Sequence, residues 1–319
     1  MNILLVGAGA VGQVYGYHLQ RGGARVAFFV RPKAAAACER GMVLYALNTR
    51  APRVPIRFEA AAVFTSLDEV AKETWDEVWF CVPANAVEDA WLASIATAVG
   101  QARIVALPPG LESEQRIRRA FPGRDVVPGL IGMVSYQTPL PGEIVPEPGI
   151  AFYFAPGVPT VLGGPLGKAV AAELKAGGCP AVAKPDAGVS SAFGSAILMP
   201  TVAGLEAAGW SLREFRRSDV PKLVVRAARE AVAITAAKVG TRAPLGLLLL
   251  SAFALRVAAW LLPKIASFDV EAYLKHHFVK VGDQTRLMFS QYAKDGAANG
   301  LKSDALAALL ERAEAAHRD

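Results

Sequence analysis

Three glycines near the N-terminus have the spacing of a phosphate-binding loop. They follow the apolar run Ile3–Val6 and precede a helix-like segment. In such a loop the first glycine permits a tight turn, the second lets a pyrophosphate approach the backbone, and the third lets the helix pack against the strand. The free N–H groups and the dipole of the helix attract the phosphates. The order strand, loop and helix predicts a dinucleotide site, with a glycine turn that binds no ligand as the alternative. The predicted cofactor-binding residues here are Gly7, Gly9, Ala10, Val11 and Gly12.

The residue after the second expected strand indicates which dinucleotide binds. The strand Arg25–Val30 is followed by Arg31-Pro32-Lys33, at a place where NAD sites usually carry an acidic residue for the ribose 2′-hydroxyl. A carboxylate would repel a 2′-phosphate, whereas a guanidinium binds it through two charge-assisted hydrogen bonds. Arg31 therefore favours NADP(H), and the alternative is a solvated arginine at a strand end.

The composition is that of a globular protein with room for two domains. The chain has 319 residues, of which 53% are hydrophobic and 19% charged, and its formal net charge is +6. Basic residues do not cluster with aromatic ones, so we expect no nucleic-acid partner. The positive balance suits an anionic cofactor and an anionic small-molecule substrate.

The cysteines and the apolar segments bear on location and assembly. Cys38, Cys81 and Cys179 are few, odd in number and widely spaced, which argues against a disulfide framework and favours the cytoplasm. The first expected strand begins at residue 2, so we expect no signal peptide. The apolar segment Ala243–Leu262 is interrupted by Arg256 and is short for a membrane span. We expect it to form a buried helix or, through Leu245–Leu250, the contact of a homodimer, and we expect no membrane contact.

The first half of the chain alternates between strand and helix patterns. This alternation implies parallel strands joined by right-handed crossovers, and so an α/β fold with an N-terminal Rossmann-type domain. The expected strands are Ile3–Val6, Arg25–Val30, Val78–Val82, Ile104–Leu107 and Asp125–Pro128, the expected helices are Ala10–Arg21, Ala86–Val99 and Glu114–Phe121, and a hairpin-like excursion covers Met42–Leu47 and Ile56–Glu59.

In the second half of the chain the expected secondary structure changes twice. Between Ser135 and Leu162 turns rich in Pro and Gly surround short β-like pieces at Glu143–Val145 and Ala151–Phe154. After Asp186 the pattern is almost wholly helical, which predicts an all-α C-terminal domain. We therefore expect an NADP(H)-binding domain over residues 1–185 and a helical domain for substrate binding and dimerisation over residues 186–319. The expected helices include Lys222–Val239, Glu271–Tyr292 and a last one that begins near Ser303.

Taken together, these segments resemble the ketopantoate reductase (2-dehydropantoate 2-reductase) family along nearly the whole chain. The resemblance implies a cleft between a Rossmann domain and a helical domain that binds NADPH and a 2-oxo acid. It also implies that Val82 and Pro83, after the strand Val78–Val82, lie beside the cofactor. The matching segments are the glycine loop, the strand that ends in Arg31, Pro141-Gly142-Glu143-Ile144 with Gly163, Met199-Pro200-Thr201 and the helix from Asp269 to Gly282.

Several positions depart from the family pattern. Pro83 stands where members usually carry a lysine, and Pro109-Gly110 replaces an Asn-Gly that contacts the cofactor. The lysine of the second domain, which protonates the ketone oxygen in the family, falls near Ser191. Reducing a ketone places negative charge on oxygen, which a cationic donor stabilises. Losing these groups indicates a changed substrate, a changed chemistry or lost catalysis.

The resemblance leaves three candidate catalytic residues. One of two family asparagines falls near Ser195. Ser191 and Ser195 are four residues apart and share a helix face. The alternative is that both are small residues that allow close helix packing. The family's substrate-binding glutamate corresponds to Asp269 or Glu271, although Asp269 at a helix start also suits an N-cap. The sequence shows no metal-ligand spacing.

We therefore expect a cytoplasmic NADP(H)-dependent oxidoreductase. The resemblance implies hydride transfer to a small 2-oxo acid or a related carbonyl or imine. The alternative is a protein that binds NADP(H) without turnover, as a sensor or a partner-binding module.

Overall fold

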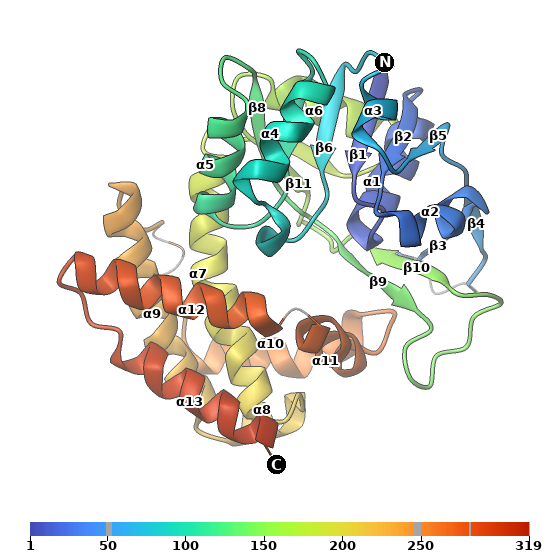
Figure 1. Cartoon of the computed structure of the whole chain (residues 1–319). Coiled ribbons are helices and arrows are strands. Elements are labelled where there is room, and N and C mark those ends of the chain that lie inside the picture. The colour runs from blue at the N-terminus through green and yellow to red at the C-terminus, as the bar shows by residue number, and fades with distance from the viewer. Residues whose placement is uncertain (49–52, 245, 247–249, 281, 319) are drawn as a thin grey trace. The chain divides into compact units, whose positions relative to one another are not determined.

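The computed structural model describes residues 1–319 except 49–52, 245, 247–249, 281 and 319 (Figure 1). The chain divides into two compact units, Met1–Ser191 and Ala192–Asp319, which are described separately. The division lies six residues after the boundary expected at residue 185. The α/β class with a helical C-terminal part is confirmed.

The first unit contains an eight-stranded sheet in the order β12-β11-β8-β7-β6-β1-β2-β5. The neighbouring strands from β8 to β5 are all parallel, as the alternating pattern predicted, and β11 alone among the described pairs of this sheet runs antiparallel to its neighbour β8. The strands are β1 (Asn2–Val6), β2 (Arg25–Phe29), β5 (Ala62–Phe64), β6 (Glu77–Phe80), β7 (Arg103–Ala106), β8 (Val126–Leu130), β11 (Thr160–Leu162) and β12 (Ala181–Ala183).

Helices lie on both faces of this sheet (Figure 1). Alternate residues of β1 belong to different cores: Ile3 and Leu5 pack with one set of elements, and Leu4 and Val6 with another. A strand buried on both faces reads as a continuous apolar run, which is why β1 carries no polar residue after Asn2. The first core includes side chains of α1 (Ala10–Arg21), α2 (Pro32–Glu39) and α6 (Gly167–Ala176), and the second those of α3 (Leu67–Val70), α4 (Asp89–Ala98) and α5 (Leu111–Ala120).

A second sheet of four strands has the order β4-β3-β10-β9. Its strands β3 and β4 pair antiparallel, which confirms the expected hairpin-like excursion. The prediction of a β-like piece at Glu143–Val145 is wrong. The Glu143 carboxylate accepts a hydrogen bond from the backbone N–H of Leu140 at 2.7 Å and so closes a turn rather than a strand. The strands are β3 (Met42–Ala46), β4 (Ile56–Phe58), β9 (Val134–Thr138) and β10 (Gly149–Tyr153).

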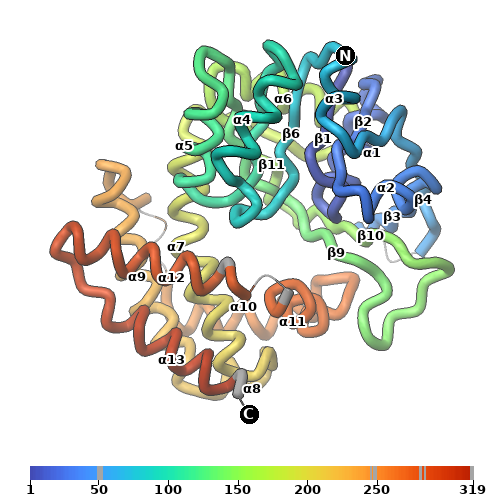
Figure 2. Tube along the Cα trace, viewed as in Figure 1, coloured from blue at the N-terminus to red at the C-terminus, as the bar shows by residue number. Residues whose placement is uncertain are grey.

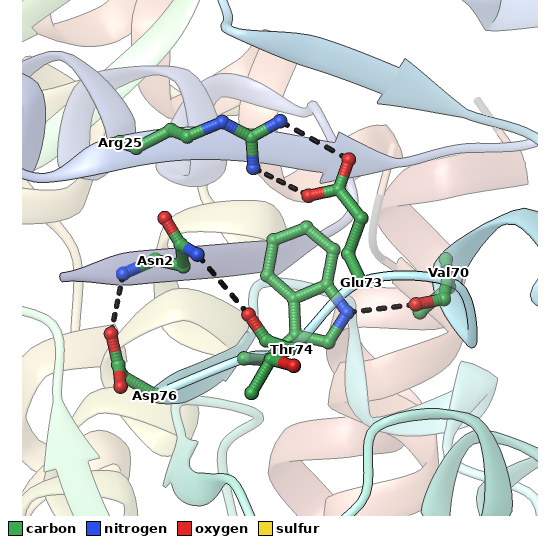
Figure 3. Close-up of polar contacts among 7 residues, drawn as sticks. Asn2, Arg25, Val70, Glu73, Thr74 and Asp76 are labelled. Atoms are coloured by element: carbon green, nitrogen blue, oxygen red, sulfur yellow. Dashed lines mark hydrogen bonds and ion pairs between the residues drawn. The ribbon is translucent and has the colours of Figure 1, made fainter.

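Polar contacts fix the start of the parallel strands (Figure 3). The backbone N–H of Asn2 donates to Asp76 Oδ2 at 2.6 Å, and its side-chain amide donates to the Thr74 carbonyl at 3.2 Å. Arg25 binds Glu73 with two hydrogen bonds of 2.5 and 3.1 Å. These polar contacts therefore lie at the amino ends of β1 and β2, opposite the carboxyl ends at which α/β proteins bind ligands.

The second unit is helical, as predicted (Figure 2). Helix α9 is at its centre and packs against α8, α10, α12 and α13. The Glu230 carboxylate of α9 accepts hydrogen bonds from the N–H groups of Ala305 and Leu306 and so caps α13. The helix expected over Glu271–Tyr292 corresponds to α11 and α12, and residue 281 between them lies outside the described residues. The helices are α7 (Ala187–Ala207, shared with the first unit), α8 (Leu212–Arg217), α9 (Val220–Val239), α10 (Ala252–Ile265), α11 (Val270–Lys280), α12 (Gly282–Ala298) and α13 (Asp304–Arg318).

Two apolar segments bear on the membrane question. By length and composition alone, α7 is the one helix in the described chain that could cross a bilayer, and half of its tested window is buried. A buried core helix of a globular protein passes the same test. The segment Leu245–Leu250, expected to mediate a dimer contact, lies mostly outside the described residues.

Candidate functional site

The glycine loop joins β1 to α1 and is held by contacts on both sides. Gly7 has a φ of +100°, which favours glycine, and its N–H donates to the Phe29 carbonyl at 3.0 Å. A Cβ on Gly7 would lie 3.0 Å from Val82 Cγ1. The side-chain amide of Gln13 donates a hydrogen bond to the Ala8 carbonyl at 2.9 Å. Both neighbouring strands and the first turn of α1 therefore hold the loop in place.

The other two glycines differ sharply in their surroundings. A Cβ on Gly12 would lie only 2.1 Å from the Gly7 carbonyl oxygen, so any side chain here would force the helix away from the loop. Gly9 has nothing within 4 Å of the same position. The structure therefore explains Gly12 by packing within the protein, whereas no described contact requires a glycine at position 9. A ligand that approaches the backbone closely would require it.

The N-terminus of α1 can receive an anion. Gly9 is the N-cap residue and supplies no side-chain hydrogen bond, and the first turn contains no acidic residue. The first backbone bond into the helix runs from the N–H of Gln13 to the Gly9 carbonyl at 3.0 Å. The N–H groups of Ala10, Val11 and Gly12 therefore have no acceptor within the helix. These donors and the positive end of the helix dipole favour a phosphate.

Arg31 lies just beyond the carboxyl end of β2, beside the glycine loop. The register pairs Val6 with Phe29, so Arg31 follows the partner of the last residue of β1 by two positions. Its backbone is extended at the N-cap of α2, with Pro32 at the first helical position. The side chain is exposed, and within the described chain no hydrogen bond or ion pair holds its guanidinium. That group can therefore bind an anion.

Val82 and Pro83 complete this edge of the sheet. The last residue of β6 that pairs with β1 is Phe80, opposite Val6, and the N–H of Cys81 then donates to the Val6 carbonyl at 3.0 Å. Val82 touches the loop at Gly7, and Pro83 is the N-cap of a 3-10 helix, η1 (Ala84–Ala86). Burial raises the pKa of the Cys81 thiol well above its usual range, so this cysteine stays protonated and packs behind the loop.

All eight predicted cofactor residues therefore meet at one edge of one unit. They fit a dinucleotide, because the space above Gly9 and the free N–H groups of α1 offer what a pyrophosphate needs. Binding itself stays a prediction.

A small hollow that is open to solvent lies at the carboxyl ends of β7 and β8. Its lining includes Ser191, which is half-buried, and Glu114, which sequence reasoning did not single out. An Arg118 hydrogen bond of 2.9 Å holds the Glu114 carboxylate. A Cβ on Gly188 would lie 2.6 Å from Glu114 Oε2, so this glycine leaves room for the carboxylate at the start of α7. The whole lining is Ala106, Pro108, Gly110, Leu111, Glu114, Pro128, Gly129, Ala187, Gly188 and Ser191.

The remaining candidates belong to the second unit, where their contacts are structural. Asp269 Oδ1 accepts a hydrogen bond from the N–H of Ala272 at 3.0 Å and so caps α11. Glu271 Oε1 accepts one from the N–H of Leu212 at 2.6 Å, at the start of α8. Ser195 is half-buried on α7. The described residues contain no group of three or more possible metal ligands.

Comparison with known proteins supports the resemblance inferred from the motifs. Residues 3–152 match the model of the family described as ketopantoate reductase PanE/ApbA. The match covers slightly less than half of the chain, and over these residues it confirms the expected resemblance to that family. No curated protein matches the sequence.

Solved structures of similar fold cover almost the whole chain. A PanE/ApbA family ketopantoate reductase from Ralstonia eutropha JMP134 has 20% identity and a TM-score of 0.72, over 99% of this chain and 98% of that one. A 2-dehydropantoate 2-reductase from Methylococcus capsulatus has 19% identity and a TM-score of 0.71, over 98% and 95%. A D-mandelate dehydrogenase with NADH and anilino(oxo)acetate has 14% identity and a TM-score of 0.72, over 99% and 98%. The chain therefore has an oxidoreductase fold of the ketopantoate reductase and D-mandelate dehydrogenase type.

Proposed function

We propose that this protein is an NADP(H)-dependent oxidoreductase that transfers a hydride to a small 2-oxo acid or a related carbonyl or imine. The observation that carries the proposal is the open space beside Gly9, next to the N–H groups of α1 that have no acceptor within the helix. The match of residues 3–152 to the ketopantoate reductase family supports the proposal. Reduced nicotinamide, when bound, supplies the hydride.

The chain's own groups would bind the two charged parts of the cofactor separately. The N–H groups of Ala10, Val11 and Gly12 would hold the pyrophosphate at the helix N-terminus. The Arg31 guanidinium would bind the 2′-phosphate, because it is exposed and held by no described residue, and because a carboxylate that would repel this phosphate is missing from positions 31–33. Val82 and Pro83 would contact the cofactor past the loop.

The substrate side rests on neutral and acidic groups. The Ser191 hydroxyl can donate a hydrogen bond to the carbonyl oxygen as negative charge develops on it. Glu114 brings a carboxylate to the same hollow, and the lining contains no lysine or arginine. Ser195 is a second hydroxyl on the same helix. A neutral donor stabilises an oxyanion less than an ammonium does, so we expect slower reduction than a lysine-bearing site achieves.

The substrate class is supported by a structure of similar fold. The D-mandelate dehydrogenase structure contains anilino(oxo)acetate, a 2-oxo acid derivative, together with NADH. We propose the cytoplasm as the place of action, because Cys38, Cys81 and Cys179 are all free thiols.

A substrate panel tests the proposal. Purified protein is incubated with NADPH and a series of 2-oxo acids and imines, with ketopantoate first, and oxidation is followed by the loss of NADPH absorbance. In parallel, thermal melts with and without NADPH report binding. We expect NADPH to raise the melting temperature and at least one substrate to be turned over. A melting temperature that NADPH leaves unchanged would refute cofactor binding, and binding without turnover across the panel would favour the sensor.

A further inference from the structure

The hollow at the carboxyl ends of β7 and β8 contains a single ionisable side chain. Among the ten described residues that line it, Glu114 is the one acidic residue, and none is a lysine, arginine or histidine. The Ser191 hydroxyl is the other polar side-chain group of this lining. The remaining eight lining residues are glycines, alanines, prolines and one leucine. The charge of the lining is therefore that of one carboxylate.

The two oxygens of the Glu114 carboxylate have different surroundings. Arg118 Nε donates a hydrogen bond to Oε1 at 2.9 Å, and Arg118 Nη2 lies 2.8 Å from the same oxygen. Oε2 faces the start of α7, where a Cβ on Gly188 would lie 2.6 Å from it. Within the described part of the chain no N–H or O–H group donates to Oε2. This oxygen therefore keeps its lone pairs for a group that enters the hollow.

A neighbouring glutamate shows what helix stability alone explains. Glu112 and Glu114 both lie in the first turn of α5, where the helix dipole favours a negative charge. Arg116 binds Glu112 at 2.9 Å, four residues on, as Arg118 binds Glu114. Glu112 is exposed and lies outside the hollow. The ion pair and the dipole thus account for both glutamates, but they do not account for the direction of Glu114 Oε2 toward Gly188.

A carboxylate without a neighbouring cation in the lining favours a cationic ligand. The carboxylate of an incoming anion would meet a like charge, whereas an ammonium or iminium N–H would donate a charge-assisted hydrogen bond to Oε2. Arg118 is exposed and does not line the hollow, so water screens its charge from a ligand there. Because the hollow is small, it suits the nitrogen end of a ligand rather than a whole molecule. We propose that this hollow binds the protonated nitrogen of an imine substrate, and that Glu114 determines this substrate class.

This inference rests on the proposed oxidoreductase function for its chemistry. Strands β7 and β8 are the second and third from β1 in the sheet, so about 10–15 Å separate the hollow from the glycine loop along the same edge. Hydride transfer to an iminium carbon oxidises the reduced nicotinamide and moves the C=N electron pair to nitrogen, which becomes a neutral amine. This step needs no proton donor. A carboxylate beside the nitrogen favours the protonated imine, which is the form that accepts a hydride.

Binding of pyrrolidine, a cyclic amine that is protonated at neutral pH, tests the charge requirement without turnover. The full chain is titrated without cofactor and followed by ligand-observed NMR, with tetrahydrofuran as the neutral ring of the same size. We expect saturable binding of pyrrolidine alone, and a Kd that Glu114→Gln raises about 10-fold or more. Glu112→Gln is the matched control, because it removes the same charge and the same kind of ion pair outside the hollow. Its Kd should equal that of the wild type.

Two results of this titration would overturn the proposal. One is pyrrolidine that does not bind the wild type saturably, and the other is a Kd that Glu114→Gln leaves unchanged. A second variant keeps the charge and moves it. The methyl of Gly188→Ala would lie 2.6 Å from Glu114 Oε2, and the carboxylate ends a flexible side chain, so we expect it to turn away without loss of melting temperature. Gly188→Ala should raise the Kd for pyrrolidine as Glu114→Gln does, and an unchanged Kd would also overturn the proposal.

Turnover separates this inference from the proposed function. For each imine of the substrate panel and the 2-oxo acid of the same carbon skeleton, the ratio of their kcat/KM values is measured with NADPH. We expect the wild type to favour the imine and Glu114→Gln to lower the ratio about 10-fold or more. Reduction of 2-oxo acids with a ratio that Glu114→Gln leaves unchanged would overturn the imine site and leave the oxidoreductase function intact. A melting temperature that NADPH leaves unchanged would refute the function, while pyrrolidine binding would still report on the hollow.

Discussion

Replacing Gly9 by alanine tests whether this glycine is required for cofactor binding or for the stability of the fold. The added methyl meets nothing within 4 Å, and Gly9 has an ordinary φ of −73°. We therefore expect the free energy of unfolding to fall by less than about 1 kcal/mol, the cost of alanine at an N-cap. If a pyrophosphate occupies that space, the methyl holds it away from the N–H groups of α1. Losing one hydrogen bond to a charged group costs about 1.5–3 kcal/mol, or roughly a 10- to 100-fold rise in the Kd for NADPH.

Gly12→Ala should produce the opposite balance. Its methyl would lie 2.1 Å from the Gly7 carbonyl oxygen, so the loop and α1 must separate by about 1 Å. Overpacking of this kind costs about 1–3 kcal/mol, and we expect a clear fall in the melting temperature before any ligand is added. Gly9→Ala should therefore mainly weaken NADPH binding, and Gly12→Ala should mainly lower the stability of the fold.

Calorimetric titration and thermal melts of both variants test this reasoning. Gly246→Ala is the control, because Gly246 is exposed in the second unit and has nothing within 4 Å; both its stability and its Kd should match the wild type. A Gly9→Ala variant that binds NADPH within twofold of the wild type would refute the placement of the pyrophosphate. A Gly9→Ala variant that melts as early as Gly12→Ala would refute the claim that the space is open.

Four further variants test single residues. Arg31→Ala should raise the Kd for NADPH by about 10- to 100-fold in calorimetry and leave NADH unchanged; equal losses would remove the 2′-phosphate assignment. Ser191→Ala should lower kcat and kcat/KM in the NADPH absorbance assay by about 10-fold or more without changing the Kd for NADPH, and an unchanged kcat/KM would remove Ser191 from the proposed chemistry. Asp269→Ala should lower the free energy of unfolding by about 1 kcal/mol in urea titrations with kcat/KM unchanged, whereas a large rate loss would restore its catalytic role. Burial and Glu173 raise the pKa of Glu77 to about 7, so the folded state keeps a proton that the unfolded state loses, and stability falls as the pH rises from about 4.5 to 7. Glu77→Gln should flatten that slope in melts at several pH values, and an unchanged slope would show that Glu77 does not titrate there.

The sequence predicted the parts of the fold that short-range patterns determine. The β1–loop–α1 unit follows from one apolar run and three glycines, and its neighbours follow from the same alternation. Helix α6 (Gly167–Ala176) was not predicted, because Gly167 begins it and its first turn has no acidic residue. The false strand at Glu143–Val145 has β-forming residues, but Thr138, Leu140 and Tyr136 donate hydrogen bonds to Glu143 from nearby in space. Propensity gives no information about such contacts.

The candidate site was predictable on the cofactor side and only partly on the substrate side. Gly9 and Arg31 could be found because each lies just after an expected strand, where dinucleotide-binding proteins place the residues that contact the cofactor. Glu114 was missed, because its presence in the hollow depends on Gly188, 74 residues later, which has no side chain to displace it. Asp269 and Glu271 were candidates by resemblance, yet backbone N–H groups account for both carboxylates. No spacing in the sequence shows which carboxylate a backbone donor will bind.

This difference has a physical origin that also shapes the proposed chemistry. A dinucleotide is bound largely by backbone groups, so its site survives as long as the glycines and the strand ends survive. A substrate is bound by side chains that separate segments bring together, and each of these can change alone without loss of the fold. By the resemblance, the family's two lysines fall at Pro83 and near Ser191, while Gly7, Gly9 and Gly12 keep the spacing of a dinucleotide-binding loop. We expect a chain changed in this way to bind the hydride donor but to lack the cation that would favour a ketone oxygen. Its substrate should therefore need less help from a cation than ketopantoate does, which an imine that already carries a proton would satisfy.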